Sequence, residues 1–242
     1  MSFVVFTFMS IAENIAEVRD RIAAAAVRAG RNADGITLMA VSKTFSAAAV
    51  REAYAAGVRV FGENRVQEFA GKVDSLRDLG GTEWHLIGHL QSNKAARAAE
   101  LFAAVDSVDS VKLAEKLSAA AAELGKTLPV LIEINVGGEE AKSGVAMGSG
   151  ELGKILIGVD DWKNLAVRGL MTVPPYTEDP EGSRPYFRRL REIREKIAAR
   201  RLPGVSMDVL SMGMSHDFEI AIEEGSTCVR VGTAIFGERQ QL

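Results

Sequence analysis

Short apolar runs alternate with amphipathic segments along almost the whole chain. The apolar runs have the length and β-branched content of strands that are buried on both faces. They fall at residues 36–42, 58–62, 83–87, 103–106, 129–135, 166–171, 207–211 and 227–231. The segments between them are helix-like, most clearly 184–201, with apolar residues along one face, and 110–124, which is rich in Ala, Leu, Lys and Glu.

A further helix precedes the first strand, because Ile11, Ile15, Val18 and Ile22 recur at helical spacing. We therefore expect the fold to begin near Ser10, after an N-terminal extension of residues 1–9. Residues 1–8 are apolar but too short to span a bilayer, and they lack the basic region and cleavage site of a signal peptide. They are interpreted as an extension from an upstream start codon or as an ordered cap.

Strand–helix units in this number predict an α/β protein, a single (β/α)8 TIM barrel over residues 10–242 with an additional N-terminal helix. A doubly wound open sheet is the alternative. Polar residues favour the barrel, since several stand at or just past the end of a predicted strand, and a barrel gathers these ends at one rim. They are Lys43, Asn64, Asn135, Ser211 and Arg230.

Composition places the chain among ordinary globular proteins. Of its 242 residues, 47% are hydrophobic and 25% are charged, and the formal net charge is −3. Nothing in this balance indicates a nucleic-acid or membrane surface. The single cysteine, Cys228, excludes an intrachain disulfide framework and a cysteine metal cluster, and a reducing cytoplasm fits best.

The stretch "ITLMAVSKTFS" ends an apolar run at a lone lysine, Lys43. A lysine at a barrel mouth is partly desolvated, which lowers its pKa and makes the neutral amine available to attack a carbonyl. The alternative is a rim lysine that pairs with a carboxylate or reaches solvent.

Two other motifs have ordinary structural explanations. Asn64 is expected either to cap the following helix or to reach a ligand at the rim. His85 and His89 are four residues apart, but on a strand that spacing separates them by about 13 Å. A zinc pair is therefore not expected, and Gln91, Ser92 or Asn93 is expected to help start the next helix.

The last two strands are followed by turns suited to an anion. Ser211 and Gly213 offer a hydroxyl and bare backbone N–H groups, with Ser215 or Asp217 as the cap of the next helix, and Gly232–Thr233 opens another short helix. Phosphate sites after strands 7 and 8 recur in barrels, although two ordinary capped turns would give the same pattern. With Lys43, a phosphate site implies a phosphorylated aldehyde, either pyridoxal 5′-phosphate (PLP) or a sugar phosphate in an aldolase-like site. The glycine-rich loop at 137–150 is either a mobile lid or a solvated loop.

Several motifs together resemble one family. They are "AVSKTF", "FGENRVQE", "WHLIGHLQSNK", "EINVGGEEAKSGV", "RGLMTVPP", "LSMGMSHDFEIAI" and "VRVGTAIFGER". In this order, from about Ser10 to Arg239, they resemble the YggS/PROSC family of pyridoxal phosphate homeostasis proteins, which is similar to the barrel domain of bacterial alanine racemase. The resemblance implies a PLP-binding barrel with a role in vitamin B6 balance.

The resemblance also implies roles for single residues. Lys43 matches the lysine that holds PLP as a Schiff base, and Arg230 matches the arginine that faces the pyridine nitrogen. Ser211, Gly232 and Thr233 match the phosphate-binding positions, and Asn64 matches a rim residue near the cofactor. The extra residues 1–8 are the one departure from the pattern.

An arginine at the pyridine nitrogen only donates hydrogen bonds, so it weakens the ring as an electron sink and disfavours transamination. Racemisation needs a second acid/base, which alanine racemase takes from a second domain; Tyr176 and Tyr186 are more simply a loop residue and a helix residue. We therefore expect a PLP carrier or regulator with no catalytic residue and no metal. The alternatives are a weak PLP-dependent amino-acid racemase and a lysine aldolase. The expected partners are PLP and apoenzymes that use it, and the expected state is a monomer.

Overall fold

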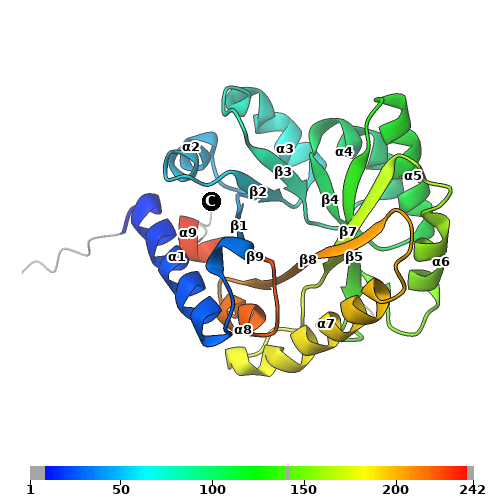
Figure 1. The fold of residues 1–242 in the computed structure, drawn as a ribbon. Helices are drawn as coiled ribbons and strands as arrows, with labels where there is room; N and C mark the ends of the chain where they lie inside the picture. Colours follow the sequence, from blue (N-terminus) through cyan, green and yellow to red (C-terminus); the bar gives the residue numbers. More distant parts are fainter. Residues whose placement is uncertain (1–8, 140–141, 239–242) are drawn as a thin grey trace, which may run out of the picture.

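The computed structural model describes residues 9–139 and 142–238, which form a barrel of parallel strands inside a ring of helices (Figure 1). The expectations about residues 1–8 lie outside the described part. No helix in the described ranges is long and apolar enough to cross a membrane.

Eight of the described strands make the closed barrel. They are β1 (Thr37–Val41), β2 (Val60–Glu63), β3 (Glu83–Leu86), β4 (Ala104–Val108), β5 (Leu128–Asn135), β7 (Leu165–Met171), β8 (Val205–Met214) and β9 (Cys228–Val231). Neighbours pair in parallel from β4 through β1, β9 and β8 to β5, and a β4–β5 pairing closes the ring. The predicted TIM barrel is confirmed, and the open sheet is excluded by this closure.

A helix follows each barrel strand and covers its outer face (Figure 1). These helices are α2 (Ala47–Ala55), α3 (Val66–Lys72), α4 (Ala95–Leu101), α5 (Val111–Glu123), α6 (Glu151–Gly158), α7 (Arg184–Ala198), α8 (Phe218–Glu223) and α9 (Thr233–Phe236). Short 3₁₀ turns occupy Ala33–Gly35, Val73–Leu76, Ser92–Lys94 and Pro180–Ser183. The strands and helices that alternate along the sequence thus form the inner barrel and the outer ring of the fold.

The additional helix α1 (Ile11–Arg28) lies against α2, α8 and α9. It begins where the sequence indicates, because Ser10 and Glu13 form a reciprocal capping box. Ser10 Oγ accepts a hydrogen bond from Glu13 N at 3.2 Å, and Glu13 Oε2 accepts one from Ser10 N at 2.7 Å. The predicted apolar face of the helix is buried, including Ile15, Val18 and Ile22.

An aromatic cluster fills the layer between the barrel and α3 and α4. Phe69 lies 4.7 Å from Trp84 and 4.9 Å from Phe102 between ring centroids, and Trp84 stacks on Phe61 at 4.8 Å. Burying each ring stabilises the fold by about 1.5–3 kcal/mol, so this cluster helps to hold β2 and β3 in place.

Two element boundaries differ from those predicted. Strand β8 continues to Met214 instead of ending at 211, and the loop at 137–150 contains a short strand, β6 (Val145–Ala146), that pairs with the end of β5. The loop is therefore partly tied to the sheet.

The predicted caps also differ in detail. Arg65, not Asn64, is at the N-cap position of α3, and Asp217 is at that of α8 without a side-chain cap bond. Asp217 Oδ1 instead accepts a hydrogen bond from Met214 N at 2.7 Å, because the longer β8 leaves only a tight turn before the helix. Ser92–Lys94 form a 3₁₀ turn that leads directly into α4, as expected for the start of that helix.

Candidate functional site

A cavity of about 510 Å³ lies at the C-terminal ends of the barrel strands. Its lining includes the predicted site residues Lys43, Asn64, Arg230, Gly232 and Thr233, together with Glu133, Lys142 and Ser215. The barrel thus brings together side chains from segments as distant in sequence as residues 43 and 233. This end of a TIM barrel is where ligand sites form.

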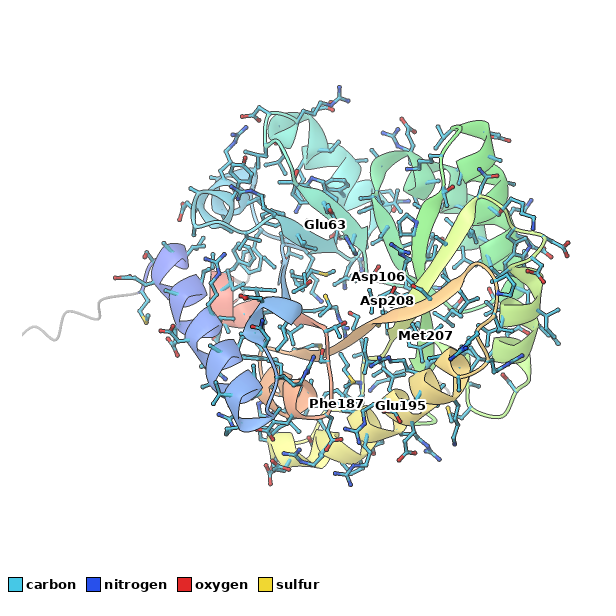
Figure 2. All side chains as sticks on the ribbon, in the orientation of Figure 1. Glu63, Asp106, Phe187, Glu195, Met207 and Asp208 are labelled. Carbon is cyan, nitrogen blue, oxygen red and sulfur yellow. The ribbon has the colours of Figure 1, made fainter. Side chains whose placement is uncertain are left out.

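Lys43 is half-buried in a turn just after β1, and the side chain of Lys72 bonds to the backbone of this turn. Lys72 Nζ donates to Ser42 O at 2.9 Å and forms an ion pair with Glu63 Oε1 at 2.6 Å. Glu63 also accepts a hydrogen bond from Ser42 Oγ at 2.5 Å and lies inside the ring of helices (Figure 2). The next residue, Thr44, has φ +65°, a strained value for a β-branched residue, so these contacts fix a turn that would not form alone.

Asn64 reaches the cavity because a glycine lets its backbone approach the neighbouring turn. A Cβ added at Gly88 would lie 2.3 Å from Asn64 O, which no side chain tolerates. His89, which follows Gly88, also lines the cavity and bonds Asp109 Oδ2 at 3.1 Å.

Arg230 lines the floor of the cavity and is 3% exposed. Its guanidinium donates to Ser211 Oγ at 2.8 Å and to Thr172 O at 2.7 Å, which fixes its orientation on β9. Burial lowers the pKa of Arg230, while the charges of Asp106 and Glu133 act in the opposite direction. An arginine in this setting still acts as a hydrogen-bond donor and not as an acceptor.

Ser211 and Asn135 do not line the cavity, although Asn135 is the last residue of β5, where the strand-end argument places it. Ser211 is fully buried and accepts from Arg230, and it does not line the cavity, because β8 runs three residues further. Ser215 does line the cavity, and its Oγ accepts hydrogen bonds from Gly232 N at 3.2 Å and from Ala234 N at 3.3 Å. Asn135 instead ties the following loop, donating to Glu139 O at 2.8 Å.

The turn after β9 is linked to the turn that carries Lys43. Phe45 stacks on Phe236 of α9 with ring centroids 4.7 Å apart. The turn that carries Lys43 and the turn that carries the donors at Gly232 and Ala234 are therefore linked by packed side chains.

The two histidines of "HLIGH" are separated, as the strand spacing predicts. His85 Nδ1 bonds the carboxylate of Asp106 at 3.0 Å and lines a cavity of about 430 Å³ at the opposite end of the barrel from His89. Among the described residues, no group of His, Cys, Asp or Glu has the geometry of a metal site. Cys228 lines the same lower cavity, and burial raises its pKa to about 12, so it is held as a thiol.

Glu133 and Ser215 are among the cavity residues that sequence reasoning missed. Glu133 is 5% exposed on β5, and the available signal was an acidic residue inside the apolar run 131–134. Of the charged loop residues considered, Lys142 lines the cavity, pairs with Glu139 and donates to Pro174 O at 3.3 Å; Glu140 lies outside the described residues.

The fold and the site define a class: a TIM barrel whose mouth combines a lysine, a buried arginine and a turn rich in hydrogen-bond donors. Such a set fits PLP, since an amine, a guanidinium and N–H donors complement an aldehyde, a pyridine nitrogen and a phosphate.

Comparison with known proteins agrees with this class. The family model for the alanine racemase N-terminal domain matches residues 10–240. A pyridoxal phosphate homeostasis protein of Aquifex aeolicus is 46% identical over 96% of this chain and 100% of its own length. Its counterpart in Pseudomonas aeruginosa is 47% identical over 95% of this chain and 96% of its own.

A similar solved structure is that of PipY from Synechococcus elongatus with PLP bound, which is 38% identical, has a TM-score of 0.82, and is matched over 94% of this chain and 100% of that one. The chain belongs to the family of pyridoxal phosphate homeostasis proteins, within the alanine racemase N-terminal domain family.

Proposed function

We propose that this protein binds PLP at the barrel mouth and takes part in intracellular vitamin B6 homeostasis as a carrier or regulator. One observation carries the proposal: Lys43 and Arg230 line the same cavity as Ser215 and Gly232, which are joined by a hydrogen bond. These residues come from distant parts of the chain. The names of the relatives and the PLP bound in PipY support it.

When bound, PLP supplies an aldehyde that forms a reversible covalent bond to an amine. In the proposal that amine is Lys43 Nζ, held at the mouth by the turn that Lys72 secures. Arg230 would donate to the pyridine nitrogen, and Ser211 orients Arg230. Asn64, just past the end of β2, would lie near the cofactor.

The phosphate is proposed to bind at Gly232 and Thr233. The N–H groups of Gly232 and Ala234 already converge on the Ser215 hydroxyl. A phosphate oxygen accepts such donors more strongly than a hydroxyl does, because it is charged. We therefore assign Ser215 to the phosphate site, in addition to the positions named from the sequence, and we give Ser211 the role of a support for Arg230.

A carrier is favoured over an enzyme by the residues around the cavity. Arg230 cannot accept a hydrogen bond from a protonated pyridine nitrogen, so it would favour the unprotonated ring, which is a weaker electron sink for carbanion chemistry. The two tyrosines considered as a second acid/base are placed elsewhere: Tyr176 is 79% exposed, and Tyr186 packs on the core from α7. We propose that the protein acts as a monomer in the cytoplasm and passes PLP to apoenzymes.

The first test is the visible spectrum of the purified protein with PLP, before and after excess alanine, for wild type and Lys43→Ala. We expect a yellow band in the wild type only, with reduction by borohydride fixing the mass of the cofactor on the peptide that contains Lys43. Lys43→Arg is the matched control, because it keeps the positive charge but does not form the bond.

The outcomes separate the alternatives. A persistent band without D-alanine supports the carrier. Accumulation of D-alanine that needs Lys43 would make the protein a racemase. A wild type that stays colourless with PLP, but is trapped by borohydride in the presence of a sugar phosphate, would make it an aldolase.

A further inference from the structure

Among the described residues that line the cavity, Glu133 is the one carboxyl group, and the proposed roles leave it without a function. It lies on β5, across the barrel from β1, which Lys43 follows, and only 5% of it is exposed. Its Oε1 accepts a hydrogen bond from Ser143 Oγ at 3.0 Å, and its Oε2 has no hydrogen-bond partner among the described residues. A buried polar atom without a partner destabilises the protein, and a ligand that bonds to it would remove this cost.

The surroundings of Glu133 favour its protonated form. Burial, which is the largest cause, raises its pKa, and the charge of Asp109 after β4 raises it further. The hydrogen bond from Ser143, the Arg230 guanidinium on β9 and His89 after β3 act in the opposite direction, but the net shift is upward. Because Oε1 already accepts from Ser143, a proton belongs on Oε2, the atom without a partner.

The chemistry of PLP offers one group for such a donor. The aldehyde and the pyridine nitrogen stand opposite each other on the ring and are assigned to Lys43 and Arg230. The phosphate arm and the phenolic hydroxyl lie on opposite sides of that axis. If the phosphate is held at the start of α9, beside β9, the phenolic oxygen would lie on the other side of that axis, and the strand order puts β5 on the side of the barrel away from β1 and β9.

We infer that Glu133 is a cofactor-binding residue that donates a hydrogen bond from a protonated Oε2 to the phenolic oxygen of PLP. This inference rests on the proposed function. An ionised carboxylate would instead repel the phenolate and the phosphate. The neutral acid therefore adds a donor to the cavity without adding negative charge.

The test compares the binding of PLP and of 3-deoxypyridoxal 5′-phosphate, which lacks the phenolic hydroxyl, by absorbance and fluorescence titration. The proteins are wild type, Glu133→Ala, Glu133→Gln and the control Glu178→Gln, which removes an exposed loop charge. Urea unfolding of each apoprotein shows that it is folded.

We expect Glu133→Ala to weaken PLP binding about tenfold and to leave binding of the deoxy analogue unchanged. Glu133→Gln retains a donor and is expected to bind PLP nearly as well as wild type. The visible band of Glu133→Gln with PLP should also lose any pH dependence that comes from ionisation of Glu133. The control Glu178→Gln should bind both ligands as the wild type does.

Three results would overturn the inference: Glu133→Ala binds PLP as tightly as wild type, it weakens both ligands equally, or Glu133→Gln fails as Glu133→Ala does while remaining folded. A wild type that binds neither ligand would overturn the proposed function itself, and the inference with it.

Discussion

Lys43 is held at the barrel mouth by two residues that do not line the cavity. Glu63 is fully buried, and Lys72 neutralises it while donating to the backbone on both sides of Lys43, at 2.9 Å to Ser42 O and 3.5 Å to Phe45 O. The same ion pair therefore serves stability and positioning, and substitutions can separate these two contributions.

Replacing Lys72 with methionine is expected to destabilise the protein by about 3–5 kcal/mol, because it leaves Glu63 as an unpaired buried carboxylate. The double variant Glu63→Gln, Lys72→Met should recover most of this loss, since no buried charge remains. It should still bind PLP several-fold more weakly, because the turn at Lys43 stays unsupported. Urea unfolding and PLP titration measure the two effects, and full recovery of both would show that Lys72 does not position Lys43.

The pair of His85 and Asp106 predicts how stability depends on pH. Burial alone lowers the pKa of His85, but the charges and hydrogen bonds of Asp106, and to a lesser extent of Glu83, together outweigh it, so the net pKa is raised. The folded state then binds a proton more tightly than the unfolded state. This stabilising contribution is present below the ordinary histidine pKa near 6.5 and is lost as pH rises through the higher folded value.

We expect urea midpoints of the wild type to fall as pH rises above about 6.5. Asp106→Asn and His85→Gln should each flatten this part of the profile, and the double variant should add nothing further. If the urea midpoint of Asp106→Asn still falls with pH as in the wild type, this pH dependence comes from another group.

Close contacts between neighbouring strand–helix turns set the shape of the mouth. Gly88 has space for no side chain beside Asn64, whereas Gly71 in α3 has nothing within 4 Å of its added Cβ. The two glycines therefore make a matched pair for substitution by alanine: the new side chain would collide with the Asn64 backbone at Gly88 and would meet no atom at Gly71.

Gly88→Ala is expected to cost about 1–3 kcal/mol and to weaken PLP binding, because the Asn64 backbone must move. Gly71→Ala should instead stabilise the protein by about 0.5–1 kcal/mol through helix propensity, with PLP binding unchanged. Thermal unfolding and PLP titration of both variants check this. Equal effects from the two would contradict the role of contact at Gly88.

Helices and strands could be predicted from the sequence wherever the pattern of apolar residues is characteristic of one of them. All eight barrel strands overlap their predicted ranges, since buried parallel strands are continuous apolar runs. The end of β8 was missed because a glycine at position 213 is typical of a turn. In the structure Gly213 lies within β8 with φ +93°, and a glycine is needed there because an added Cβ would lie 2.5 Å from Ala221 Cβ on α8.

The candidate site was predictable in part for the same reason. Lys43, Asn64, Arg230, Gly232 and Thr233 stand beside strand ends, so a barrel brings them together. Glu133 depends on barrel closure, because its burial among Ser143, Arg230 and Asp109 joins residues from three other parts of the chain. No local pattern contains that information.

For the molecule as a whole, the helices near the chain's two ends are tied by charge. Glu219 and Glu223 of α8 pair with Arg21 and Arg28 of α1. Glu224, which follows α8, pairs on its other side with arginines of α7, namely Arg184, Arg188 and Arg191. Figure 1 shows α1, α8 and α7 following one another around the ring. This network closes the helix layer where the first and last parts of the chain meet.

Glu224 is the centre of that network, with its side chain 5% exposed and three guanidinium groups within 3.2 Å. Burial raises its pKa, but the arginines outweigh this, and the net pKa is lowered. Its contribution to stability is therefore present above the ordinary carboxyl pKa and is lost as pH falls through the lower folded value. Glu224→Gln should cost about 1–3 kcal/mol near neutral pH and should lessen acid sensitivity, because three arginines lose their shared partner.

The matched control is Glu100→Gln, which removes an exposed pair with Arg97 within α4 and is expected to change stability by less than about 0.5 kcal/mol. Urea unfolding at two pH values and two salt concentrations measures both variants. A small loss for Glu224→Gln, equal to that of Glu100→Gln, would mean that the ion pairs of Glu224 with α7 add little to the packing of α7 beside α8. A large, pH-dependent loss with PLP affinity unchanged would show that the network stabilises the barrel without shaping its mouth.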